Sequence, residues 1–249
     1  MELKELIDLS NRAFQEKNFQ KVIELLTKVI VLQPDRYEIY LRLGLASSSL
    51  GKLEEAIGYF EKGASINPNS SPIYCNLGNL YAELNNKNLA LKNYFRAVEI
   101  DPKNFNANYN LGSYYYKIDD AENAEKYLNL AINITPNHIY PYNSLFLLYD
   151  RSNNYKKLEE ILKKAKNFFP ENSLINFFEG IVEYRNKNFK IAIDIFLKAD
   201  LDKKDISRNM LKTNYLAKSY DNLGLYQEAY KFFEISNKIS EELPKNDSN

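Results

Sequence analysis

The chain has no tryptophan and only one cysteine and one histidine among its 249 residues. The lone cysteine, Cys75, excludes an intramolecular disulfide and a cysteine metal site. Neither positive nor negative charge is in excess, because 33 lysines and arginines balance 33 aspartates and glutamates. This balance gives no general attraction to nucleic acid or to an anionic membrane, so we expect neither as a partner.

Long apolar runs are missing as well. No stretch approaches the roughly 18–20 apolar residues of a membrane span. The opening sequence MELKELIDLSNRAF carries acidic residues where a secretory signal needs a basic stretch followed by an apolar core. We therefore expect a cytoplasmic protein.

What the sequence does contain is a period of 34 residues. Prolines mark it at Pro34, Pro68, Pro102, Pro136 and Pro170. Twelve positions before three of them lie Ala56, Ala90 and Ala124, and 24 positions before the same three lie Gly44, Gly78 and Gly112. A fixed period of this length indicates stacked repeats rather than one globular core.

The period divides the chain into seven predicted units. They are 3–36, 37–70, 71–104, 105–138, 139–172, 173–206 and 210–243. The period first fails at Lys204, which takes the proline position, and an insertion, Ser207 to Asn209, follows it. We expect this irregularity to set the last unit at a different angle, and residues 244–249 to form a polar tail.

Each unit is predicted to contain two helices. In the third unit Tyr74, Leu77, Gly78 and Tyr81 follow helical spacing, and a break at Asn85 precedes a second helical segment. The residues at the position of this break tolerate a left-handed backbone in five units, with Lys17 and Lys187 as exceptions. We expect the glycines to let the first helix approach the second, where the alanines face it, and most aromatic residues to be core.

This pattern resembles the tetratricopeptide repeat. Residues 74–102, YCNLGNLYAELNNKNLALKNYFRAVEIDP, match the family at nearly every signature position. The resemblance implies an all-α fold, an α-solenoid of stacked antiparallel helix pairs in a right-handed superhelix. It also implies that the first helices line a concave groove that binds an extended peptide or a partner segment, without catalysis. The strict period argues against the related 35-residue RNA-reading repeats, as does the absence of a basic face.

If that geometry holds, a set of polar and aromatic residues lines the groove. The predicted peptide-binding residues are Asn76, Asn79, Tyr109, Asn110, Ser113, Tyr116, Tyr140, Asn143 and Tyr184. An asparagine side chain offers both a donor and an acceptor to a peptide backbone. Asn76 and Asn110 occupy the same position one unit apart, which resembles the asparagine ladder of O-linked N-acetylglucosamine transferases. The alternative is compositional, because asparagine is abundant throughout the chain.

Two other site types are not supported. A carboxylate clamp for chaperone tails needs basic residues at set positions, and here Cys75, Tyr140 and Ser144 replace them. An active site needs tuned titratable groups, but His138 is expected in an exposed turn and Cys75 has no histidine near it in sequence. The glycines serve packing and turns rather than a phosphate loop. We expect no enzyme activity, cofactor or metal.

Three functional hypotheses follow. The first is a protein interaction scaffold that binds a partner segment in the groove. The second is the substrate-recruiting part of a larger transferase of the sulfotransferase or glycosyltransferase type, because LAKSYDNLGLYQEAYKFFEISNKI resembles the last repeat of bacterial repeat-containing sulfotransferases. The third is self-association through the carboxyl-terminal helix. We expect this helix to leave some of its large apolar side chains exposed to solvent, among Phe232, Phe233, Ile235 and Ile239.

Overall fold

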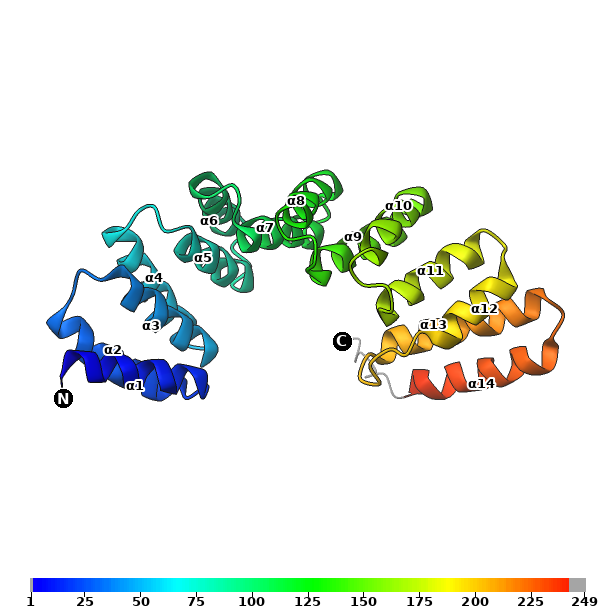
Figure 1. The fold of residues 1–249 in the computed structure, drawn as a ribbon, viewed down its shortest axis with the longest axis horizontal. Coiled ribbons are helices and arrows are strands. Elements are labelled where there is room, and N and C mark those ends of the chain that lie inside the picture. Colours follow the sequence, from blue (N-terminus) through cyan, green and yellow to red (C-terminus); the bar gives the residue numbers. More distant parts are fainter. Residues whose placement is uncertain (1, 242–249) are drawn as a thin grey trace, which may run out of the picture. The chain divides into compact units, whose positions relative to one another are not determined.

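The structure, a computed structural model, describes residues 2–241. All regular elements in this range are α-helices, fourteen in number, and no strand occurs in it (Figure 1). The all-α solenoid prediction is thereby confirmed. The predicted polar tail at 244–249 lies outside the described residues.

The helices group into two compact units, each built from consecutive helix pairs. The first unit ends at residue 135. Its helices are α1 (Leu3–Gln15), α2 (Phe19–Leu32), α3 (Tyr37–Ser49), α4 (Leu53–Ile66), α5 (Ser71–Glu83), α6 (Lys87–Ile100), α7 (Phe105–Lys117) and α8 (Ala121–Ile134).

The second unit begins at residue 136. Its helices are α9 (Ile139–Arg151), α10 (Tyr155–Lys166), α11 (Ser173–Arg185), α12 (Phe189–Lys198), α13 (Ile206–Asn222) and α14 (Tyr226–Glu241). In both units, first helices also contact each other along the stack, α5 with α7 and α11 with α13. In the first unit α3, α5 and α7 thus form a wall of successive first helices.

The turn inside each pair has one backbone geometry throughout. Residues with positive φ lie at Lys17, Gly51, Asn85, Asp119, Asn153, Lys187 and Gly224. In the third helix pair the amide N–H of Asn86 donates to the carbonyl of Tyr81 at 2.8 Å, which closes the C-terminus of α5 as in a Schellman motif. Lys17 (φ 57°) and Lys187 (φ 63°) adopt the same conformation. They are exceptions in sequence but not in structure.

The close approach of the two helices in four of the pairs depends on a glycine of the first helix. A Cβ atom on Gly78 would lie 2.5 Å from Cδ1 of Tyr94, and one on Gly44 would lie 2.5 Å from Cε1 of Phe60. We expected the alanines to face these glycines. The nearest atoms instead belong to the rings four residues after the alanines, while Ala56 and Ala90 are fully buried in the core.

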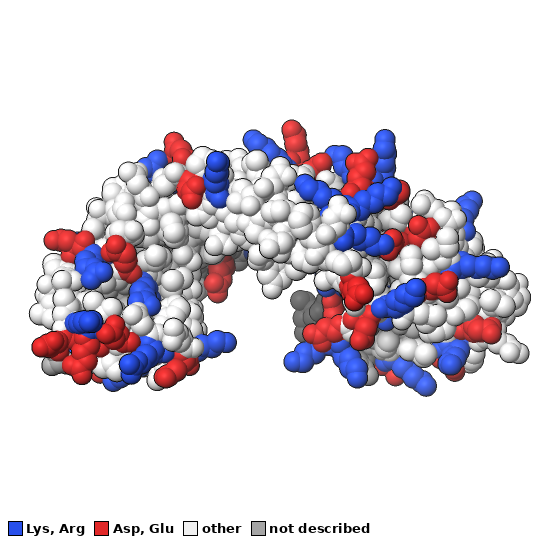
Figure 2. All heavy atoms as spheres, in the orientation of Figure 1, with Lys and Arg blue, Asp and Glu red and all other residues white. Residues whose placement is uncertain are grey.

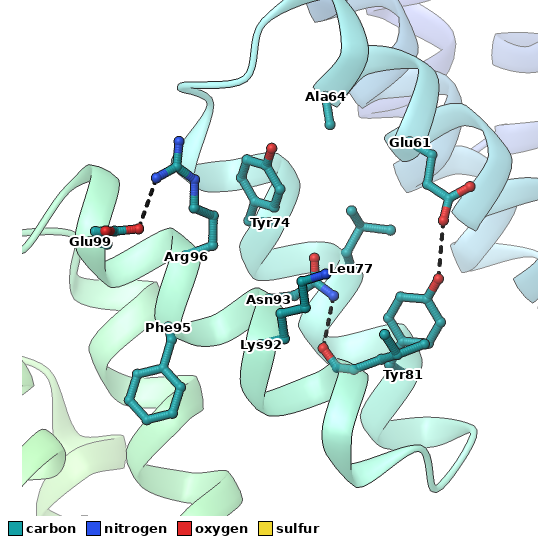
Figure 3. A pocket seen from close by; sticks show the side chains of 11 residues that line it. Glu61, Ala64, Tyr74, Leu77, Tyr81, Lys92, Asn93, Phe95, Arg96 and Glu99 are labelled. Atoms are coloured by element: carbon teal, nitrogen blue, oxygen red, sulfur yellow. Dashed lines mark hydrogen bonds and ion pairs between the residues drawn. The ribbon is translucent and has the colours of Figure 1, made fainter.

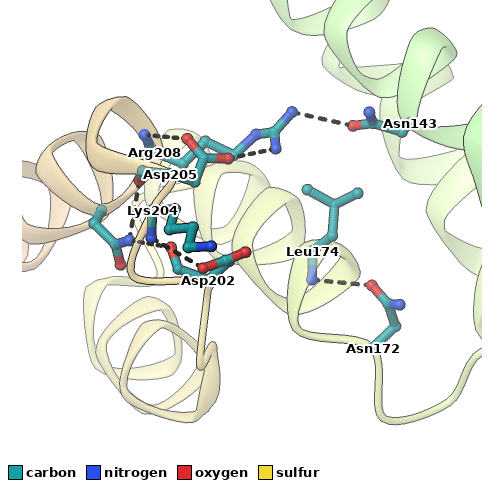
Figure 4. A network of polar contacts seen from close by, with 8 residues as sticks. Asn143, Asn172, Leu174, Asp202, Lys204, Asp205 and Arg208 are labelled. Atoms are coloured by element: carbon teal, nitrogen blue, oxygen red, sulfur yellow. Dashed lines mark hydrogen bonds and ion pairs between the residues drawn. The ribbon is translucent and has the colours of Figure 1, made fainter. Parts of the chain in front are cut away.

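The insertion before the last pair is helical, and the different angle expected for this pair stays a prediction. The inserted residues 207–209 form the first turn of α13, so they lengthen a helix and leave Ala199 to Asp205 as the connecting loop. The Arg208 guanidinium pairs with the Asp205 carboxylate at 2.6 Å (Figure 4). The Asn209 amide donates to the backbone carbonyls of Asp202 and Asp205. Polar contacts thus hold this loop where the proline is missing.

Candidate functional site

The wall of first helices in the first unit carries a pair of contacting asparagines. Asn79 on α5 and Asn110 on α7 meet, with the Asn110 Nδ2 donating to the Asn79 Oδ1 at 3.0 Å. The hydroxyl of the buried Tyr94 donates to the same oxygen at 2.8 Å. We call Asn79, Tyr109, Asn110 and Ser113 the polar wall. With Tyr94, Tyr114, Ala82 and Lys117 they line a shallow cavity of about 320 Å³.

The asparagine that Asn110 contacts by a hydrogen bond is Asn79. The Asn76 Nδ2 donates at 2.8 Å to the carbonyl of Pro72 in its own helix, and its place beside Asn110 along the groove stays a prediction. Tyr109 stacks on Phe105 with ring centroids 5.9 Å apart. Asn76 and Tyr116 do not line the cavity that the other four residues share.

Cys75 lies against the polar wall but is not a reactive thiol. It is buried, and the Asn110 Nδ2 lies 3.3 Å from its sulfur. Burial raises the pKa of the Cys75 thiol to about 11, and the contact with Asn110 only partly opposes this. The thiol is therefore protonated near neutral pH, where a nucleophilic cysteine would need to be a thiolate.

The predicted site residues in the second unit do not form one cluster. Tyr140 is 57% exposed, and its ring lies 5.0 Å from the ring of His138, which is half-buried rather than exposed as expected. Asn143 accepts a hydrogen bond from Arg208 at 3.4 Å, so it belongs to the loop network (Figure 4). Tyr184 packs edge-on against Tyr215, with centroids 5.0 Å apart.

A cationic and aromatic group surrounds Tyr184. The Arg185 guanidinium lies 5.2 Å from the ring centroid of Tyr155, and its Nη2 is 3.4 Å from the Tyr215 hydroxyl. Burial raises the pKa of the nearby Asp150 carboxyl, and the positive charge of Arg185 opposes that shift. This group holds the end of α11 against α10 and α13.

A second cavity lies elsewhere in the first unit. It measures about 630 Å³ and lies between α4 and α6, over α5 (Figure 3). Its lining includes Glu61, Tyr74, Leu77, Tyr81, Leu89, Asn93 and Arg96. The repeat pattern did not predict this cavity, because the groove expected from that pattern is lined by first helices alone. The signal was present, since Glu61 and Asn93 replace residues that are aromatic one period later.

Charge and metal chemistry add no further site in the described range. Figure 2 shows lysines and arginines interspersed with aspartates and glutamates over the visible face of each unit. Among residues 2–241 no group of three or more histidine, cysteine, aspartate or glutamate side chains has the arrangement of a metal site. Nor does any helix there have the length and apolar character needed to cross a membrane.

Comparisons with known proteins identify the repeats. Tetratricopeptide repeat models match residues 37–70, 71–104 and 105–138. No curated protein matches the chain.

Solved structures share the fold. A tetratricopeptide repeat protein from Parabacteroides merdae has a TM-score of 0.64 at 17% identity, covering 98% of this chain and 94% of its own. PilF from Pseudomonas aeruginosa has a TM-score of 0.66 at 19% identity, covering 83% and 93%. MamA from Desulfovibrio magneticus has a TM-score of 0.59 at 20% identity, covering 68% and 95%. Residues 37–138 of this chain are therefore similar to tetratricopeptide repeats, a class of repeat that in general mediates protein–protein interactions and is typically not catalytic.

Proposed function

We propose that the chain is a protein interaction scaffold that binds an extended peptide segment along the polar wall. The observation that supports this most is the contact between Asn79 and Asn110, which come from first helices of successive repeats. Such a pair presents amide groups at a spacing set by the stack itself. A peptide that runs along the stack passes both residues.

The hydrogen bonds already made leave complementary groups for a peptide. The Asn79 Oδ1 accepts from both Tyr94 and Asn110, so its amide NH₂ remains as a donor. Asn110 uses its NH₂ toward Asn79 and Cys75, so its Oδ1 remains as an acceptor. One donor and one acceptor match the C=O and N–H of a peptide backbone, which favours binding with little dependence on sequence.

The test uses Asn110→Ala, with Asn76→Ala as a matched control. Asn79 is kept because the buried Tyr94 hydroxyl donates to it. Peptides are first selected from a random library on the wild-type protein, and their affinities are then measured by calorimetry. We expect Asn110→Ala to weaken binding about tenfold, corresponding to roughly 1.4 kcal/mol. Asn76→Ala should bind like wild type because its side chain is engaged within α5.

Equal affinity of Asn110→Ala and wild type for the selected peptides would remove the polar wall as the binding surface.

The substrate-recruiting hypothesis stays a prediction, and reading the gene downstream of codon 249 tests it. Location in the cytoplasm likewise stays a prediction.

A further inference from the structure

Among the gaps between successive second helices of the first unit, the one between α6 and α8 is filled by aromatic rings. Between α6 and α8, Phe95 lies 6.3 Å from Tyr115 and 6.4 Å from Tyr127, measured between ring centroids. Tyr115 and Tyr127 stack with centroids 5.8 Å apart and planes 9° from parallel. Three rings from three successive helices thus occupy this gap.

The gap one period earlier keeps only one of the three rings. The residues 34 positions before Phe95, Tyr115 and Tyr127 are Glu61, Tyr81 and Asn93. Two aromatic side chains are therefore replaced by smaller polar ones, and the cavity of about 630 Å³ lies here (Figure 3). The volume is within the range of small-molecule and side-chain pockets.

The lining of this cavity is apolar below and hydrogen-bonding at one side. Leu77, which is 3% exposed, and Leu89 contribute apolar surface. The Arg96 guanidinium lies over the Tyr74 ring, 5.9 Å from its centroid. Arg96 is neutralised by Glu99 at 2.8 Å. On the α4 side the Glu61 Oε1 accepts from the Tyr81 hydroxyl at 3.1 Å.

Glu61 has capacity for a further donor. A carboxylate offers about four lone-pair positions on two oxygens, and Tyr81 uses one of them. A flat ring in the cavity would contact the Tyr81 ring, as the three rings contact one another in the next gap. A ring that also carries an N–H or O–H group would reach a charged acceptor, which strengthens the hydrogen bond.

We propose that the cavity between α4 and α6 receives one tryptophan or tyrosine side chain of a protein partner, with its N–H or O–H donating to Glu61. A phenylalanine ring would fill the same space but leave the carboxylate without that donor. The site shares no residue with the polar wall. It therefore does not depend on the peptide-binding proposal, and either can fail alone.

The absence of tryptophan from the chain makes the test direct. N-acetyltryptophanamide is titrated with the full-length protein, and its fluorescence anisotropy is followed with excitation beyond the tyrosine absorption. We expect a saturable rise with wild type. Asn93→Tyr restores the ring found at Tyr127 one period later, so it should fill the cavity and weaken probe binding at least about tenfold.

Further measurements distinguish a filled cavity from a misfolded variant and specific binding of the probe from non-specific binding. Asn88→Tyr adds the same side chain to an exposed position of α6 outside the cavity, and it should bind the probe like wild type. In competition, N-acetyltyrosinamide should displace the probe at a concentration about tenfold lower than N-acetylphenylalaninamide. Glu61→Gln, which keeps the shape but loses the charge, should bind the probe several times more weakly, about fivefold.

The proposal is overturned if wild type shows no saturable binding up to the solubility of the probe, or if Asn93→Tyr binds it as tightly as wild type does. Equal competition by the tyrosine and phenylalanine amides would overturn the role of Glu61. An unchanged affinity of Glu61→Gln would do the same without relying on Asn93→Tyr.

Discussion

Lys17 and Lys187 occupy the left-handed turn position that glycine, asparagine or aspartate fills in the other pairs. A left-handed conformation costs a side chain with a Cβ about 1–2 kcal/mol relative to the right-handed region. Glycine avoids this cost but loses more chain entropy on folding, which offsets part of the gain. The turn geometry is therefore imposed on the lysines by the packing of the helices that they connect.

Replacing each lysine by glycine should consequently stabilise the protein. We expect Lys17→Gly and Lys187→Gly each to raise the free energy of unfolding by about 0.5–1 kcal/mol, measured by urea denaturation. Asn85→Gly serves as the control, because asparagine tolerates this conformation, and it should change stability by only a few tenths of a kcal/mol, roughly 0.3. A loss of stability in both lysine variants would contradict this account of the turn.

At the level of the helix, the spacing between the two members of a pair depends on residues without a Cβ. Gly78 lies against the ring of Tyr94, where a Cβ would be 2.5 Å away, whereas Gly58 in α4 has no atom within 4 Å of the corresponding point. The second pair of the second unit follows the same rule, with Gly180 against Phe196. In the first pair of that unit, Phe146 takes the glycine position and is itself fully buried.

The two glycines should thus respond to alanine with opposite signs. Gly78→Ala should lower the free energy of unfolding by about 1–3 kcal/mol, because Tyr94 must move. Gly58→Ala should raise it by about 0.5–1 kcal/mol through helix propensity alone. Both are measured by denaturation with circular dichroism, and a stabilising Gly78→Ala would show that the pair has room to separate.

For the whole molecule, the exposed aromatic face of α14 is the feature that the helix stack leaves uncovered. Tyr226 is 69% and Tyr230 66% exposed, and Ile235 is 38% exposed. Phe232, Phe233 and Ile239 are half-buried, so Tyr226 and Tyr230 carry more of the exposed surface than the residues that we expected there. Neighbouring aromatic side chains on one helix favour contact with another surface.

We predict that the protein self-associates through this helix. Sedimentation equilibrium should show a mass that rises with concentration for wild type and a constant monomer mass for the double variant Tyr226→Gln and Tyr230→Gln. Val31→Gln, which removes a 79% exposed apolar side chain from α2, should associate like wild type. A constant monomer mass for wild type at all concentrations would end this hypothesis.

The sequence by itself determined the all-α fold and where its helices end. Helix periodicity and turn residues are local properties, so a 34-residue period records them directly, and the helix break at Asn85 was readable for that reason. The polar wall was predicted in part, because the repeat register places Asn79 and Asn110 on first helices. Division of the whole chain into seven repeats stays a prediction.

Tertiary structure decided which side chains meet. Asn110 donates to Asn79, whereas Asn76 donates within its own helix, because hydrogen bonds between stacked helices depend on their offset and not only on repeat position. The hydrogen-bond partner of Asn143 is Arg208, which lies 65 residues further along the chain and could not be paired with it from the sequence. The cavity beside Tyr81 required the same information, since an empty volume exists only once the neighbouring helices have been placed around it.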